Sequence, residues 1–174
     1  MAAQVIAGTT TINASFVQTD STGLITPIQA QGLIQFINQF NNLTGTANGV
    51  DTLYAAQLTL AAAATHINLH AATDILGNSV VFARVRFWAV QVVTATAGFI
   101  VNIYTRTGTD PVTWLPVTTT GALWCTPTGV VMGVDPNSTS TNGYVVGSSA
   151  YDFTVDPGGN TVVCNLLIAG NSAA

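Results

Sequence analysis

From residue 53 onward, apolar and polar residues alternate in short segments rich in β-branched and aromatic side chains. A period of two over four to eight residues predicts β-strands, because successive side chains of a strand face opposite sides of its sheet. Turn residues separate the segments, among them Asp110-Pro111, Asn142-Gly143 and the run 156–160. The eight expected strand regions are 53–60, 65–69, 80–93, 99–106, 123–125 with 130–134, 144–146, 151–155 and 161–168. This pattern predicts an all-β fold, a jelly-roll-like antiparallel β-sandwich.

The first fifty residues have a different pattern. Thr-rich extended pieces precede a segment in which Thr26 and Pro27 resemble a helix N-cap followed by proline at the first helical position. Leu33, Ile37 and Phe40 then share one helical face. We therefore expect one short helix at about 27–42. It would cover one end of the sheet or, alternatively, bind a partner.

These two patterns divide the chain into an N-terminal extended arm with the short helix, residues 1–50, and a β-sandwich domain, residues 51–174. A length of 174 residues fits one domain with an arm. No internal repeat of fixed period occurs, which disfavours a solenoid or propeller.

The strand region 80–93 carries two of the three arginines. Alternation places Phe82, Arg84, Arg86 and Trp88 on one face, and it places Ala83, Val85, Phe87 and Ala89 on the other, expected core, face. On the first face the guanidinium groups can stack on the aromatic rings. The alternative is a subunit contact or an anion site, so Arg84, Arg86 and Trp88 are interface candidates together with Leu33, Ile37 and Phe40.

Charge is scarce in this chain: 6% of the residues are charged, and Lys and Glu are absent. An ordinary soluble domain has about 25% charged residues. A surface made of Thr, Asn, Ser, Gln and Gly suits packing against copies of the same chain. With three cations and a net charge of −4, the chain is not expected to bind nucleic acid, since phosphate contacts need clustered Lys or Arg.

The termini and the apolar stretches bear on localisation. The N-terminus lacks the basic region and the long apolar run of a secretory signal, so synthesis in a cytosol is expected. The uncharged stretch 87–105 is interrupted by polar residues and a turn, so a membrane span is not expected either.

Few residues could support catalysis or metal binding. His66 and His70, with Asp74 nearby, are weak candidates for a metal site, and a polar surface is the preferred interpretation. Cys125 and Cys164 could meet across a sheet, but free buried thiols are favoured in a cytosolic chain. We expect no catalytic residue, no cofactor and no enzyme activity.

The aromatic residues leave a second function open. A row of exposed rings could stack on sugars and make a carbohydrate-binding sandwich. The possible members of such a row are Trp88, Trp114, Trp124, Tyr104 and Tyr144. Trp114 and Trp124, however, have the sequence context of buried strand ends, so this function ranks second.

Two stretches carry a resemblance to a known group of proteins. One comprises 58–69 and 74–86, and the other comprises the closing strands 143–146, 151–155, 158–162 and 167–170. Over roughly residues 50–170, this succession of strands and turns resembles small virion proteins of tailed bacteriophages.

The resemblance implies a non-enzymatic virion structural protein made in the bacterial cytoplasm, most plainly a capsid decoration or cement protein of jelly-roll type. Its expected partners are its own copies, in a symmetric oligomer that we expect to be a trimer, and the major capsid protein or other virion proteins. The alternative is a fibre, tail or other capsid component that binds host-surface carbohydrate. Such proteins act through binding energy alone, and a low charge makes binding insensitive to salt.

Overall fold

The computed structural model describes residues 50–73, 77, 79–94, 98–106, 111–116, 121–135 and 144–172 in full, and residues 8–20 and 28–40 by their backbone. The described residues form strands joined by turns and contain no α-helix. The expected all-β class is therefore confirmed, with antiparallel pairing throughout the named strands.

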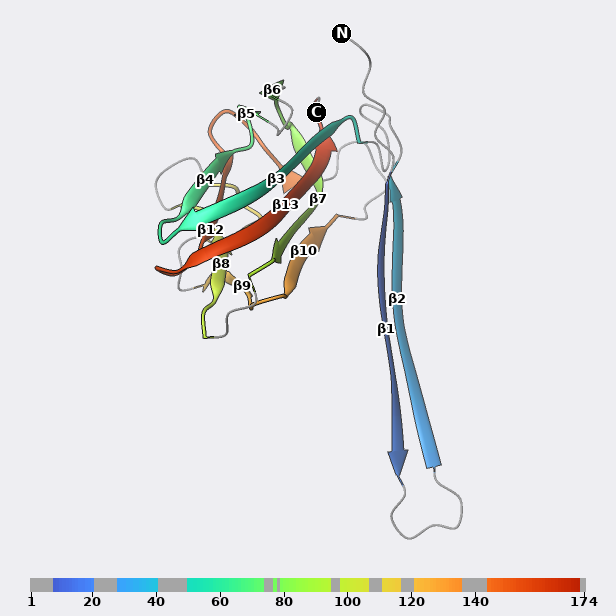
Figure 1. Ribbon diagram of the computed structural model, residues 1–174. Coiled ribbons are helices and arrows are strands. Elements are labelled where there is room, and N and C mark those ends of the chain that lie inside the picture. Colours follow the sequence, from blue (N-terminus) through green and yellow to red (C-terminus); the bar gives the residue numbers. More distant parts are fainter. Residues whose placement is uncertain are drawn as a thin grey trace.

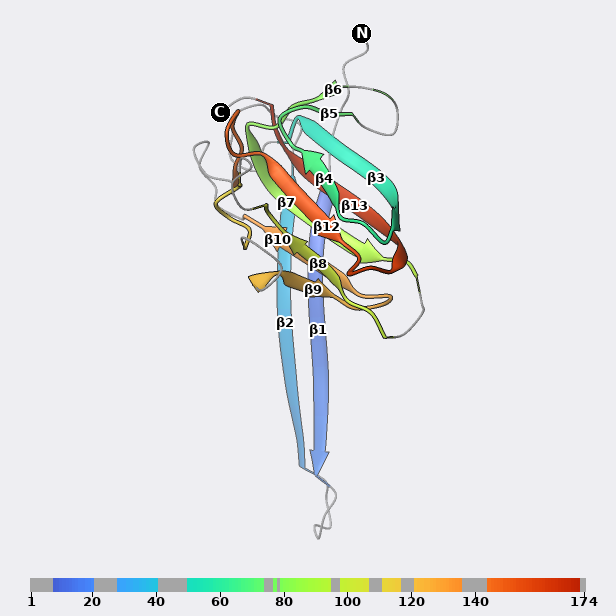
Figure 2. The ribbon, with the colours of Figure 1, turned by 90° about the vertical axis from the view of Figure 1, so that its left-hand side faces the viewer.

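Two sheets form a β-sandwich (Figures 1 and 2). The first has the order β10-β7-β13-β3, with β11 also paired to β7, and the second has the order β4-β12-β8-β9. The strands of the first sheet are β3 (Thr52–Ala61), β7 (Arg84–Val92), β10 (Val130–Val134), β11 (Tyr144–Val145) and β13 (Thr161–Asn171). Those of the second are β4 (Thr65–Asn68), β8 (Val101–Tyr104), β9 (Leu123–Cys125) and β12 (Asp152–Asp156). A small ribbon pairs β5 (Ala72–Thr73) with β6 (Ser79–Val80).

The hydrophobic core fills the space between the two sheets. Trp88 of β7 meets Phe153 of β12 edge to face, with ring centroids 5.5 Å apart. Such a geometry suits the ring quadrupoles and adds to the free energy of burial. Trp114 stacks on Tyr144 at 4.8 Å and closes one end of the core. Cys125 and Cys164 are buried and form no disulfide, as the sequence led us to expect.

Residues 1–50 were expected to contain a short helix at about 27–42, and this prediction is wrong. β2 (Ile28–Phe40) is a strand that pairs along its whole length with β1 (Gly8–Asp20). The physical reason is visible in the sequence, where Gln29, Gln31 and Gln35 alternate with apolar or small residues. That period of two outweighs the capping signal before the segment. We call this β1–β2 hairpin the arm.

The arm is a long ribbon separate from the two sheets. Figures 1 and 2 both show one end of it beside the sandwich and the other end well beyond it. Within the described residues, β1 and β2 pair only with each other. Each strand has 13 residues, which gives a length of about 40 Å.

The expected facing of β7 is also wrong over part of its length. Trp88 lies in the core, and Phe87 lies on the outside of the first sheet. The cause is a β-bulge, because Ala169 pairs with Phe87 while the next residue of β13 pairs with Val85. The extra residue, Arg86, reverses the alternation, so that Val85 before the bulge and Trp88 after it both face the core.

Candidate interaction surface

The outer face of the first sheet consists of rows of neighbouring residues that cross four strands. Register places Ala55, Leu167, Ala89 and Met132 side by side in one row. The next row contains Gln57, Asn165, Gln91 and Val130. No Asp, Glu, Lys, Arg or His occurs in β3, in β10, in β13 or in β7 after Arg86. We call this surface the uncharged face.

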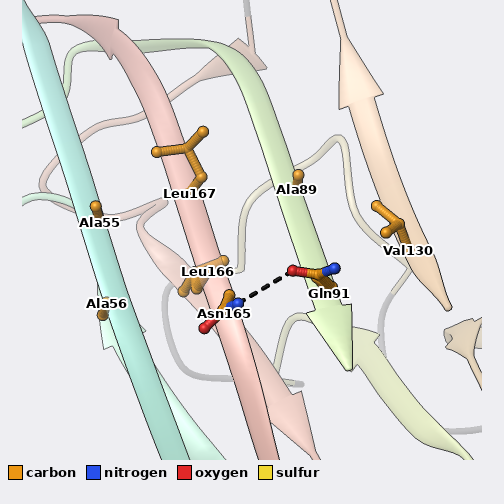
Figure 3. Close-up of a pocket in the computed structure, with 8 residues that line it drawn as sticks. All are labelled: Ala55, Ala56, Ala89, Gln91, Val130, Asn165, Leu166 and Leu167. Atoms are coloured by element: carbon orange, nitrogen blue, oxygen red, sulfur yellow. Dashed lines mark hydrogen bonds between the residues drawn. The ribbon is translucent and has the colours of Figure 1, made fainter. Parts of the chain in front are cut away.

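An open apolar groove crosses the uncharged face (Figure 3). Its volume is about 510 Å³, and its lining includes Ala55, Ala89, Leu167 and Val130. Leu167 and Val130 are 38% and 47% exposed, which is high for large apolar side chains. The small alanines on either side of Leu167 leave the hollow, because a methyl group fills little of the space above a pleated sheet.

An amide ladder borders the groove. Gln57 Nε2 donates to Asn165 Oδ1 at 3.0 Å. Asn165 Nδ2 donates to Gln91 Oε1 at 3.0 Å (Figure 3). The bonds fix the three exposed amides in one orientation and leave the amino group of Gln91 at the end of the ladder. Preoriented amides lose less side-chain entropy when they bind a polar group of a partner.

One end of the uncharged face is already covered. Phe87 and Ala169 lie on its outer side and are each only 8% exposed, and they cluster with Val50, which is fully buried. Val50 stands between the arm and β3 in the chain. Val50, just before β3, is therefore packed on the uncharged face.

The outer face of the second sheet has the opposite character. Asp152 of β12, only 1% exposed, accepts hydrogen bonds from the Arg106 backbone N at 2.9 Å, from Arg106 Nε at 3.1 Å and from Thr154 Oγ1 at 2.7 Å. Tyr104 donates to Asp156 at 3.2 Å, and burial together with that carboxylate raises the pKa of the phenol. The Arg106–Asp152 ion pair thus lies on this face of the sandwich, whereas β3, β10, β13 and the part of β7 after Arg86 contribute no charged side chain to the uncharged face.

The Asp152 cluster brings together a histidine, a hydroxyl and a carboxylate, which are groups that a nucleophilic site would also use. His66 Nδ1 lies 2.8 Å from Thr154 Oγ1 and 3.7 Å from Asp152. A nucleophile must reach its substrate, but Thr154 is fully buried and its hydroxyl donates to Asp152 instead of the histidine. The arrangement fits the role of connecting β4, β12 and β8.

The weak metal candidates are not brought together as a strand would have placed them. His66 lies in β4, but the strand ends at Asn68, and His70 lies in the following turn with its backbone N bonded to Asn68 Oδ1 at 2.9 Å. Asp74 lies outside the described residues. Among the residues described, no group of three or more His, Cys, Asp or Glu side chains is arranged to hold a metal ion.

The interface candidates of β7 lie largely inside the sandwich. Arg86 is fully buried, and its Nε donates to Asn171 Oδ1 at 3.2 Å. Burial lowers the pKa of Arg86, and the carboxylate of Asp135 opposes this effect. Trp88 is 3% exposed, while Arg84 is half-buried. Arg86 and Trp88 are thus buried within the chain, and the β-bulge is the reason why Trp88 lies on the core side.

The arm candidates share no single face. Leu33 and Ile37 occupy alternate positions of β2 and Phe40 occupies a position of the opposite parity. Their side chains lie outside the described part of the structure. The helical grouping of these three residues does not exist in a strand.

The aromatic residues form no row. Trp88 is in the core, Trp114 stacks on Tyr144 and donates from Nε1 to Val145 O at 3.0 Å, and Trp124 is 65% exposed on β9. The expectation that Trp124 ends a buried strand is wrong. Its neighbour Cys125 takes the buried position, and alternation then turns Trp124 outward.

The residues of the uncharged face were not singled out in the sequence. Gln57, Gln91 and Asn165 lie on three strands, and only the register brings them into one row. The available signal was the absence of charge from four separate strand segments.

Comparisons with protein-family models, with curated proteins and with solved structures found no match for this chain. In the part of the chain that is described, no helix has the length and apolar character that a membrane span requires.

Proposed function

We propose that this chain is a non-enzymatic structural protein of a bacteriophage virion, a decoration or cement protein of jelly-roll type that stabilises the assembled shell. It forms a symmetric oligomer, a trimer, and binds the major capsid protein or other virion subunits. The observation that carries the proposal is the contrast between the two outer faces of the sandwich. One face contains the Arg106–Asp152 ion pair, and the other is uncharged and has an open apolar groove.

Such a contrast is expected of a protein that buries one face. Charged residues are depleted at the centre of protein interfaces, and a large exposed apolar patch on a monomer marks an interaction site. A cement protein needs no chemistry, because a ligand that binds only the assembled shell stabilises it by mass action. The Asp152 cluster, with its buried hydroxyl and carboxylate, supports a structural role.

The experiment is to purify, by density gradient, the particles of a phage whose genome encodes this chain and to quantify the chain against the major capsid protein. The expected result is a fixed copy number per shell, together with a multimer in light scattering of the isolated protein. Absence of the chain from particles that were never exposed to chaotropes would contradict the virion role.

One observation favours a second candidate, a fibre, tail or other capsid component that binds host-surface carbohydrate. Trp124 is 65% exposed, and an exposed indole can stack on a sugar ring. Titration with host-surface glycans should then shift the tryptophan fluorescence, and Trp124→Ala should abolish that shift.

A further inference from the structure

The register of the arm divides its residues into two faces of different composition. One face, which we call the apolar arm face, contains the central pairs Ile12–Phe36, Ala14–Ile34 and Phe16–Gly32. Eight of its fourteen positions are apolar, against three of the twelve positions of the other face. The apolar positions of the apolar arm face are Ile12, Ala14, Phe16, Ile28, Ala30, Ile34, Phe36 and Phe40.

A ribbon of this kind needs a partner surface. An isolated two-stranded hairpin is marginally stable in water, and it becomes stable when an apolar face is covered. Figures 1 and 2 show most of the arm extending past the sandwich of its own chain. The sandwich therefore does not lie along the far part of the apolar arm face.

The strand edges of the arm supply a second, independent observation. In the described part of the chain, neither β1 nor β2 pairs with a third strand, so each has one open edge of 13 residues. Natural proteins protect such edges with Lys, Pro, bulges or short strands. The arm has none of these, and its one charged residue, Asp20, is the last of β1. Open edges of this length are suited to pairing with another strand.

The arm of a second copy can cover the apolar arm face and can also pair with the open strand edges. A symmetric contact places identical groups near one another, which is unfavourable for charged surfaces and is tolerated by an uncharged one. An identical arm also has the same length and the same alternation. The groove on the sandwich is the other apolar surface described, but it spans only a few residues of each strand, whereas each strand of the arm has 13 residues.

We propose that the arms of neighbouring copies associate with one another, with their apolar arm faces inward and their edges paired, into a closed β-bundle that holds the oligomer together. Closure covers the apolar faces and removes the open edges at the same time. This inference rests on the homo-oligomer in the proposed function and does not depend on the virion role.

Crosslinking of the full-length chain tests the arrangement. Ile34→Cys introduces a thiol on the apolar arm face, and Gln35→Cys, the matched control, introduces one at the neighbouring position on the opposite face. The native thiols are buried, and the unmodified chain reports their background. With a short bismaleimide at micromolar protein, Ile34→Cys should crosslink between copies at least five times more than Gln35→Cys. Equal crosslinking, or none in Ile34→Cys, would overturn the proposal.

A second pair of variants tests the energetic role of the apolar arm face. Phe36→Asp should lower the mass in light scattering to that of the monomer, while Gln35→Asp should leave the oligomer intact. All three tryptophans lie in the sandwich, so their fluorescence reports whether that part remains folded. An unchanged mass for Phe36→Asp would overturn the proposal. Detection of the chain in phage particles is a separate result, so the arm association and the virion role can fail independently.

Discussion

At the scale of single residues, the sandwich depends on close approaches that only a small residue permits. Gly133 of β10 lies opposite Trp88, and a Cβ at this position would collide with the indole. The indole cannot give way, because it is 3% exposed and packs against Phe153. Gly133 is therefore required by packing.

We expect Gly133→Ala to lower the free energy of unfolding by about 1–3 kcal/mol, the usual cost of overpacking a core. Gly147→Ala is the matched control, since no atom lies within 4 Å of its added Cβ. Urea unfolding followed by tryptophan fluorescence measures both. A change below about 0.5 kcal/mol in Gly133→Ala, the size expected of a neutral surface substitution, would contradict the packing.

The buried thiols should make stability depend on alkaline pH. Burial raises the pKa of Cys164 to about 11, with Cys125 nearby adding to the effect. Because the native pKa lies above the unfolded value, the native state binds the proton more tightly, and stability is complete below the ordinary thiol pKa and falls as pH rises toward 11. Between about pH 8 and pH 10 the free energy of unfolding of the native chain should fall by about 1 kcal/mol more than that of Cys164→Ala. Equal slopes in the two proteins would disprove this.

At the scale of elements, Asp152 connects three parts of the second sheet. Its carboxylate accepts from Arg106, which follows β8, and from Thr154, which in turn contacts His66 of β4. We expect Asp152→Asn to lower the free energy of unfolding by about 2–4 kcal/mol. The new amide group would point a buried donor at the N–H groups of Arg106, where no acceptor is available for it. His66→Ala, at a more exposed position, should lower the free energy of unfolding by less than about 1 kcal/mol, which is the size of a surface hydrogen bond. Equal losses in the two variants, measured by urea unfolding, would contradict the central role of Asp152.

Most strands could be predicted from the sequence, because alternation and turn residues are local signals. The helix expected at about 27–42 was wrong because Thr26-Pro27 is a strong helix start signal. The alternation of Gln29, Gln31 and Gln35 was the better guide to the conformation of residues 28–40. The facing of β7 could not be predicted, since the bulge at Arg86 depends on pairing with β13, a strand about eighty residues later in the chain. The uncharged face could not be assembled for the same reason.

The sandwich is expected to fold without the arm, whereas particle binding is expected to need both. Every strand of the two sheets lies after residue 50, and the core clusters begin with Val50. We expect the chain without residues 1–45 to keep the tryptophan emission and cooperative urea unfolding of the full chain but to lose particle binding. Retained binding to phage particles would contradict the expectation that binding depends on the oligomer that the arms hold together.

At the scale of the whole molecule, the uncharged face and the arm are expected to have different roles in assembly. If the arms join copies of the chain, the uncharged faces remain available for the shell. Leu167 stands at the centre of that face, beside Ala89 and Ala55. A carboxylate introduced there would be buried without a partner upon binding, and an uncompensated buried charge costs several kcal/mol.

We therefore expect Leu167→Asp to be retained on phage particles at least tenfold less than the native chain, since each factor of ten corresponds to about 1.4 kcal/mol. Leu167→Asn introduces a side chain of about the same volume as Asp but without the charge, so its retention on particles should fall less. Trp124→Asp adds the same charge at an exposed position on the outer face of the second sheet and should bind normally. Sedimentation of particles with each purified variant measures retention. If Leu167→Asp binds as well as Trp124→Asp, the uncharged face is not the surface that meets the shell.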